Sequence, residues 1–359
     1  MRVALVVERF EPVRGGVESV VWHVARGLVE AGDEVHVLTR RGVEAPGVRL
    51  VPLPVSALWQ PWRVLAFSRA AARAAAAGRY DVVHSFTRTL HQNVYRAGGG
   101  SHADYLARRG GAAWRRAARR LSPRHAVLLA IERRVFADPR QTIQCNSEMV
   151  RREIAARHGV PAGRLVVIWN GVDLVRFRPP AARPARAAPV WLLVGSGFAR
   201  KGVDTALRAL STARSRDTQL WIAGRDAPRE ASALASRLGV AGRVRFLGER
   251  SDVEALHAEA DALLLPTRYD AFANACLEAA ASGLPVVTSG ANGAAELLRD
   301  GALVVDDPED VAGFARALDR LEDPALRARL GAAARSVAER HGWAQHVAEL
   351  RALYTRVRG

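Results

Sequence analysis

One lysine stands next to an arginine in the stretch GSGFARKGVD, residues 195–204. Lys201 is the only lysine among the 53 basic residues of the chain, and codon preference for arginine explains its rarity but not its position. The apolar run VWLLV before it predicts a buried strand, and KGVDTALRAL predicts a helix. Arg200 and Lys201 would share the positive amino end of that helix, where two cations repel each other unless an anion joins them. An arginine fork beside a compact ammonium suits a diphosphate, and the alternative is a solvated surface pair.

Two acids accompany a second predicted helix in the stretch YDAFANACLEAAASG. Asp270 lies just before this helix, and Glu278 lies within it. A carboxylate that faces a cleft from a helix can accept hydrogen bonds from vicinal hydroxyls, such as those of a ribose. The backbone amides near Asn274 and Ala275, at the helix start, suit an anion. The alternative is an acidic pair that faces solvent.

A pair of glycines follows the first apolar run of the chain, VALVV, in the motif RGGVE. Gly15 and Gly16 therefore precede a predicted helix, where backbone amides can approach an anion closely. The loop GSGFAR repeats this arrangement in the second half of the chain with Gly197. Neither loop has the GxGxxG pattern of a dinucleotide site, and either is also compatible with ordinary turn geometry.

Two histidines are candidates for acid–base chemistry. His84 ends the run DVVHS, and His102 follows the glycines of AGGGSH. Each is a candidate general base or a hydrogen-bond donor to a sugar, although an isolated histidine is more often structural.

Residues 105–136 form a strongly basic segment with nine arginines and one acid, Glu132. Trp114 lies among the arginines, so we expect the segment to lie on an anionic membrane surface. Nucleic acid could use the same surface, and a solvated helix face is a further alternative.

The elements that position these residues alternate between apolar runs and helical patterns, which is typical of parallel α/β sheets. The alternation restarts after the stretch PAARPARAAP, and 359 residues suit two domains with a ligand cleft between them. We expect a first domain over 1–175, a linker over 176–189, a second domain over 190–340 and a terminal helix over 341–359 that packs towards the first domain.

Composition limits the cellular setting. The formal net charge of +17 indicates an anionic partner, and two widely separated cysteines indicate a reduced cytoplasm. No apolar run approaches the length of a membrane span. We therefore expect a cytoplasmic protein, soluble or peripheral to the membrane.

The motifs RGGVE, NGVD, ARKGVD and GRDAPRE, followed by the two acids and SGLPVVTS, together resemble retaining family 4 glycosyltransferases. The resemblance implies the GT-B fold, with two Rossmann-like domains, and a UDP-sugar donor. Within this family the chain is most similar to enzymes that transfer glucose from UDP-glucose to the heptoses of the lipopolysaccharide core. The resemblance also implies that the anomeric configuration is retained and that no divalent metal ion is needed. The sequence contains no D-x-D motif.

Carried over to this chain, the resemblance implies that Arg200 and Lys201 neutralise the donor diphosphate, while Asp270 faces the transferred sugar. Glu278 would hold the ribose hydroxyls. The other expected donor-binding residues are Gly15, Gly16, Gly197, Gly224, Arg225, Asn274 and Ala275.

This chain departs from the family pattern at two places. The usual first acid is glutamate, and Asp270 is shorter by one methylene. An acid that the core glucosyltransferases carry is replaced within AGGGSH, where His102 or Asp104 is the candidate substitute.

The expected acceptor is a glycolipid at the cytoplasmic face of the inner membrane, reached through residues 105–136, and we expect no nucleic-acid partner. Three alternatives stay open. They are a family member with another donor or acceptor, such as a capsule or exopolysaccharide enzyme, a sugar-nucleotide epimerase or hydrolase, and a basic nucleic-acid-binding protein.

Overall fold

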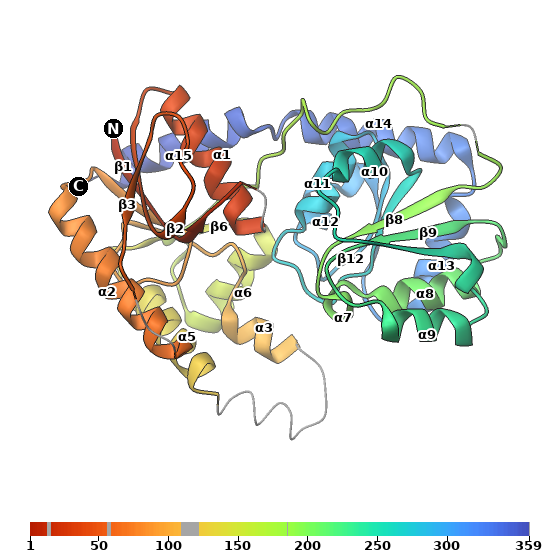
Figure 1. Ribbon diagram of the computed structural model, residues 1–359, viewed down its shortest axis with the longest axis horizontal. Helices are drawn as coiled ribbons and strands as arrows, with labels where there is room; N and C mark the ends of the chain where they lie inside the picture. Colours follow the sequence, from red (N-terminus) through yellow and green to blue (C-terminus); the bar gives the residue numbers. More distant parts are fainter. Residues whose placement is uncertain (13–15, 56–58, 109–121, 185, 359) are drawn as a thin grey trace. The chain divides into compact units, whose positions relative to one another are not determined.

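The computed structural model describes residues 1–12, 16–55, 59–108, 122–184 and 186–358. The chain forms two units (Figure 1). Unit 1 comprises Met1–Gly171 and Trp343–Gly359, and unit 2 comprises Val172–Gly342. Each unit has its own parallel sheet, so the predicted pair of α/β domains is confirmed.

Unit 1 has the sheet order β3-β2-β1-β4-β5-β6-β7, and every neighbouring pair is parallel. Its strands are β1 (Arg2–Phe10), β2 (Glu34–Gly42), β3 (Val48–Pro52), β4 (Val82–Ser85), β5 (Val94–Arg96), β6 (Thr142–Cys145) and β7 (Leu165–Val167). Its helices are α1 (Gly16–Glu30), α2 (Gln60–Gly78), α3 (His102–Arg108), α5 (Pro123–Ala137), α6 (Glu148–His158), η1 (Ala162–Arg164) and α15 (Trp343–Val357).

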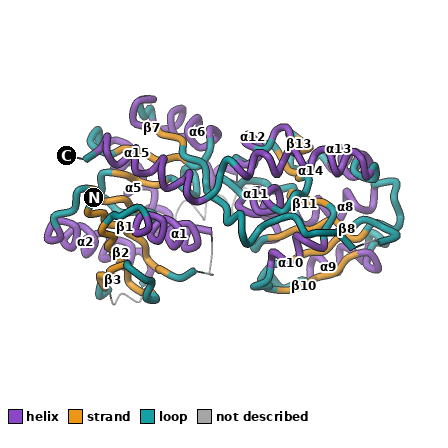
Figure 2. Tube along the Cα trace, turned by 90° about the horizontal axis from the view of Figure 1, so that it is seen from above, coloured by secondary structure: helices purple, strands orange, loops and turns teal. Residues whose placement is uncertain are grey.

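The apolar run of β1 explains why helices cover both faces of this sheet (Figure 2). Successive side chains of a strand point to opposite faces. Val3 and Leu5 pack in the core on the side of α1 and α15, whereas Ala4 and Val6 pack on the side of α2. The part of a strand that is buried on both faces must be apolar, as Val3–Val7 of β1 are.

The C-terminal helix α15 belongs to the core of unit 1. Its side chains Val347, Leu350, Leu353 and Tyr354 are buried in the same cluster as α1 and β1. Close approach of the two helices depends on Gly27, because a Cβ there would lie 2.6 Å from Cγ2 of Val347.

Unit 2 has the sheet order β10-β9-β8-β11-β12-β13, again with parallel neighbours. Its strands are β8 (Val190–Val194), β9 (Gln219–Ala223), β10 (Val244–Gly248), β11 (Ala262–Leu265), β12 (Val286–Ser289) and β13 (Ala302–Val305). Its helices are α7 (Phe198–Lys201), α8 (Val203–Thr212), α9 (Arg229–Arg237), η2 (Ala241–Arg243), α10 (Val253–Glu259), α11 (Asn274–Ala281), α12 (Ala294–Leu297), η3 (Arg299–Gly301), α13 (Val311–Arg320) and α14 (Pro324–Glu339). The strand order reverses between β8 and β11, so the loops after these two strands meet at the edge where open parallel sheets bind ligands.

The stretch 176–189, which the sequence predicts to be the linker, lies within unit 2. Its composition is misleading because its arginines bond to the unit. Arg183 donates hydrogen bonds to the backbone oxygens of His257, Ala260 and Ser282, and Phe177 is buried. The units divide instead after Gly171 and again after Gly342.

Candidate active site

Arg200 and Lys201 occupy the one-turn helix α7, between β8 and α8. The sequence predicts a single helix that begins near Gly202, but the structure separates α7 from α8 at this residue, whose φ is +73°. A Cβ at Gly202 would lie 2.0 Å from the backbone oxygen of Pro266. Close packing of α7 on the loop after β11 therefore brings both cations to that loop.

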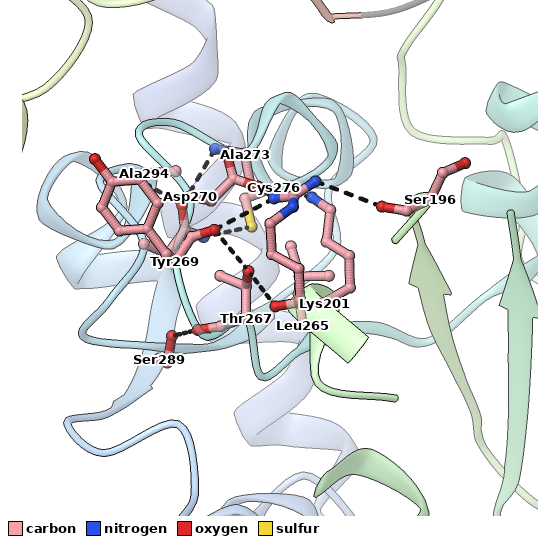
Figure 3. Close-up of polar contacts among 12 residues, drawn as sticks. Ser196, Lys201, Leu265, Thr267, Tyr269, Asp270, Ala273, Cys276, Ser289 and Ala294 are labelled. Atoms are coloured by element: carbon pink, nitrogen blue, oxygen red, sulfur yellow. Dashed lines mark hydrogen bonds and ion pairs between the residues drawn. The ribbon is translucent and has the colours of Figure 1, made fainter. Parts of the chain in front are cut away.

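The two cations meet the carboxylate of Asp270 (Figure 3). Oδ2 of Asp270 accepts from Nζ of Lys201 at 2.8 Å and from Nη1 of Arg200 at 2.7 Å. Burial raises the pKa of the Asp270 carboxyl, but Lys201 and then Arg200 outweigh burial and hold this pKa below its ordinary value. Asp270 is thus the anion that joins the predicted cation pair in this structure.

Buried polar side chains hold the loop that carries Asp270. The hydroxyl of Thr267 donates to the backbone oxygen of Arg200 at 3.1 Å. Oδ1 of Asn292 accepts from the amides of Ala273 and Ala294, and the Asn292 side chain is fully buried. Sequence reasoning missed Thr267 and Asn292, because each follows a strand as an ordinary turn residue and nothing else in the pattern marks it.

Glu278 lies in the second turn of α11 and is half-buried. Burial raises its pKa to about 7, although Arg176 and Lys201 act in the opposite direction. Asn274 and Ala275 begin the same helix and are also half-buried. The structure therefore gathers Arg200, Lys201, Asp270 and the start of α11 at one edge of unit 2.

The amino end of α7 already holds a carboxylate. Asp226 accepts from the amide of Gly197 at 2.6 Å and from the amide of Phe198 at 3.3 Å. In this structure the amide of Gly197, where the sequence predicts an anion, thus binds the carboxylate of Asp226 from the same chain. Asp226 is part of the motif GRDAPRE, but sequence reasoning gave it no role.

Gly224 and Arg225 precede Asp226 in the same turn. A Cβ at Gly224 would lie 2.4 Å from the backbone oxygen of Gly195, so Gly224 permits close packing of two strand ends. Arg225 is exposed, and its backbone amide donates to Oγ of Ser196 at 3.2 Å. Both residues support the loop that leads to α7.

Of the candidates in the first glycine loop, Gly16 begins α1 and is exposed. Gly15 lies outside the described residues, as does Trp114 of the basic segment.

His84 lies in the interior of unit 1 and has no exposed surface. Its Nδ1 forms a 2.7 Å hydrogen bond with the hydroxyl of Tyr354 in α15. Burial and then the charge of Arg96 hold the pKa of His84 well below its ordinary value. Because His84 has no exposed surface, we assign it no step in the chemistry.

His102 begins α3 and is also buried. Its Nε2 lies 3.0 Å from Nδ1 of His125, and burial lowers the pKa of His102 to about 4. Asp104 forms an ion pair with Arg157. Glu132, the acid of the basic segment, accepts hydrogen bonds from the amides of His102 and Ala103. These contacts fix α3 on α5 and α6 and give His102 and Asp104 structural partners.

Two properties of the described residues concern metals and membranes. None of their helices combines the length and the apolar character that a membrane span needs. Across the same residues, no three His, Cys, Asp or Glu side chains cluster as metal ligands would.

The fold and this site define a class of enzyme. Residues 14–176 match the family model described as Glycosyltransferase Family 4, and residues 188–323 match the model of Glycosyl transferases group 1. The D-inositol 3-phosphate glycosyltransferase of Salinispora arenicola is 30% identical over 95% of this chain and 87% of its own length. The chain therefore belongs to the glycosyltransferases of group 1, which have the GT-B fold.

Two comparisons point to one particular relative. The lipopolysaccharide glucosyltransferase WaaG of Escherichia coli K12 is 43% identical over 112 residues, which are 30% of each chain. The crystal structure of WaaG, a glycosyltransferase of lipopolysaccharide biosynthesis, superposes with a TM-score of 0.85 at 25% identity and covers 98% of this chain and 99% of that chain. The names of the two relatives give different acceptors.

Proposed function

We propose that this protein transfers a hexose, glucose from UDP-glucose, to a membrane-associated glycolipid with retention of anomeric configuration. The observation that carries the proposal is the pair Arg200 and Lys201 on a shared carboxylate, Asp270. When the donor binds, its diphosphate takes the place of Asp270 on the cations. The freed carboxylate then faces the transferred sugar.

Charge explains why this arrangement assists transfer. Cleavage of the bond between sugar and phosphate builds negative charge on the leaving diphosphate. Cations that are already positioned stabilise that charge without reorganisation in the transition state. In the retaining reaction the acceptor hydroxyl attacks from the face of the leaving group and gives its proton to the departing phosphate oxygen.

Glu278 and the start of α11 complete the proposed donor site. The ionised carboxylate of Glu278 accepts hydrogen bonds from the two ribose hydroxyls. Amides near Asn274 lie at the positive end of α11 and approach the phosphates.

The proposed acceptor is the heptose region of a lipopolysaccharide core, at the cytoplasmic face of the inner membrane. Similarity to WaaG supports this choice, and similarity to D-inositol 3-phosphate glycosyltransferases supports a different, phosphorylated acceptor. The neighbouring exposed arginines Arg133 and Arg134 of α5 fit an anionic membrane surface.

Thermal shift with UDP-glucose, UDP-galactose, UDP-N-acetylglucosamine and GDP-mannose tests the donor, because a ligand that binds the native state raises its melting temperature. We expect the largest rise with UDP-glucose, unchanged by EDTA. A rise with GDP-mannose alone would overturn the UDP-glucose assignment. Loss of the UDP-glucose shift in EDTA, restored by Mg²⁺, would overturn metal independence.

A further inference from the structure

A buried arginine in unit 1 pairs with no acid in the part of the chain that the structure describes. Arg96 ends β5 and is only 4% exposed. Its Nη2 donates to Oδ1 of Asn170 at 2.7 Å, while its Nε is buried without a hydrogen-bond partner among the described residues. The remaining segments of the chain, 13–15, 56–58, 109–121, 185 and 359, contain no Asp or Glu that could supply a carboxylate.

The surroundings of Arg96 add no compensating charge. Burial lowers its pKa to about 10, so the guanidinium stays protonated at neutral pH. Burial and then the charge of Arg96 hold the pKa of His84 well below its ordinary value, and burial lowers the pKa of His346 to about 4. Both histidines are therefore neutral, and Nε2 of His346 is buried without a described partner. A buried charge without a counter-ion is costly, so proteins normally pair it.

The guanidinium of Arg96 lies beside glycine backbone. A Cβ at Gly98 would lie 1.7 Å from Nη1 of Arg96, so any side chain there would fill the position of the guanidinium. Gly99 is exposed, and a Cβ there would meet nothing within 4 Å. Arg96 thus lies against Gly98 at the carboxyl end of β5, the edge at which parallel sheets bind ligands.

We propose that Arg96 is the centre of an anion subsite in unit 1 that binds a phosphate group carried by the sugar acceptor. The proposal rests on the proposed function only where it identifies the carrier of the phosphate as the sugar acceptor. The anion site itself follows from the unpaired charge of Arg96. A phosphate oxygen accepts from the guanidinium beside Gly98 and neutralises it.

The test uses the full chain with Arg200→Ala and Lys201→Ala, so that phosphate does not bind at the donor site. Inorganic phosphate is added at constant ionic strength against chloride, and the melting temperature is measured. We expect phosphate to stabilise this protein, and addition of Arg96→Gln to remove at least three quarters of the shift. Arg73→Gln, at an exposed arginine of α2, is the matched control and should leave the shift unchanged.

The melting temperature without phosphate distinguishes an anion-binding role of Arg96 from a purely structural one. In phosphate-free buffer Arg96→Gln should melt at a higher temperature than the parent protein, because it removes an uncompensated charge and keeps a donor for Asn170. A lower melting temperature, failure to fold, or a phosphate shift that survives Arg96→Gln would overturn the proposal.

The same titration with glucose 1-phosphate and with short-chain phosphatidic acid identifies the source of the phosphate. We expect glucose 1-phosphate to bind at least tenfold more tightly than inorganic phosphate, in a manner that requires Arg96. Equal or tighter binding of the free ion or of the lipid would overturn the assignment to a sugar acceptor. Failure of UDP-glucose to stabilise the wild-type chain would instead count against the proposed function alone.

Discussion

The side chain of Lys201 has little room. It is 9% exposed, and its stem packs on Gly195, where a Cβ would lie 2.7 Å from Cε. An ammonium at the end of this stem reaches Asp270, whereas a planar guanidinium is larger and needs a wider space. The position therefore favours lysine in a chain that otherwise uses arginine.

We expect Lys201→Ala to lower the rate of sugar transfer at least a hundredfold, which corresponds to about 3 kcal/mol for one lost transition-state contact. Lys201→Arg should lower it by at least about tenfold, since the charge is kept but the fit is lost. Steady-state kinetics with UDP-glucose measure both, with circular dichroism as the check on folding. Wild-type turnover by Lys201→Arg would leave codon preference as the explanation for the lysine.

The raised pKa of Glu278 predicts opposite pH effects on stability and donor binding. The unfolded carboxyl ionises near its ordinary pKa of 4.5, while the folded one keeps its proton up to about pH 7. Stability should therefore fall as pH rises from about 4.5 to about 7. Affinity for UDP-glucose should rise over the upper part of this range, because the ribose hydroxyls need the ionised form.

Glu278→Gln should abolish both dependences. Denaturant unfolding and calorimetric titration between pH 5 and 8 compare it with the wild type. Parallel pH profiles in the two proteins would contradict the role of Glu278.

Among single residues, the sequence marks Arg200, Lys201 and Asp270 as candidates, because residue types and helix positions are readable from pattern, and the structure brings the three side chains together. It did not predict that Asp270 bonds both cations, or that Asp226 fills the amino end of α7. Both contacts join residues far apart in the chain, and only the meeting of β8 with β9 and β11 brings them together.

Among the elements, the break between α7 and α8 determines the position of Lys201. We expect Gly202→Ala to destabilise unit 2 by about 3 kcal/mol or more, since it adds backbone overlap to a left-handed φ. Gly239 is the matched control, because its φ is +71° and a Cβ there would meet no atom within 4 Å. Gly239→Ala should cost only about 1 kcal/mol. Equal losses in urea unfolding of the two variants would show that contact with Pro266 is unimportant.

Helical periodicity and apolar runs predicted most strands and helices of both units, because burial imposes those patterns directly. The break at Gly202 was not predicted, since KGVDTALRAL is helical in pattern throughout. The expected linker was placed wrongly because a proline- and arginine-rich composition does not show that Arg183 bonds to backbone oxygens of unit 2.

For the whole molecule, the chain crosses between the units twice, and α15 completes the core of unit 1. Removal of residues 343–359 exposes the partners of Val347, Leu350, Leu353 and Tyr354. At about 1.5–3 kcal/mol for each buried side chain, the loss is comparable with the whole stability of a domain. We expect scanning calorimetry to show that unit 1 no longer unfolds cooperatively. Removal of residues 358–359 is the control, and a cooperative unit 1 in the longer truncation would contradict this account.

The central claim is that Arg200 and Lys201 bind the diphosphate of the donor. Calorimetric titration of UDP and UMP at pH 8 tests it most directly, because only UDP carries the second phosphate. We predict that the wild-type protein binds UDP at least a hundredfold more tightly than UMP, and that Arg200→Ala with Lys201→Ala reduces this ratio to less than about five. A ratio that is unchanged in the double variant would contradict the account.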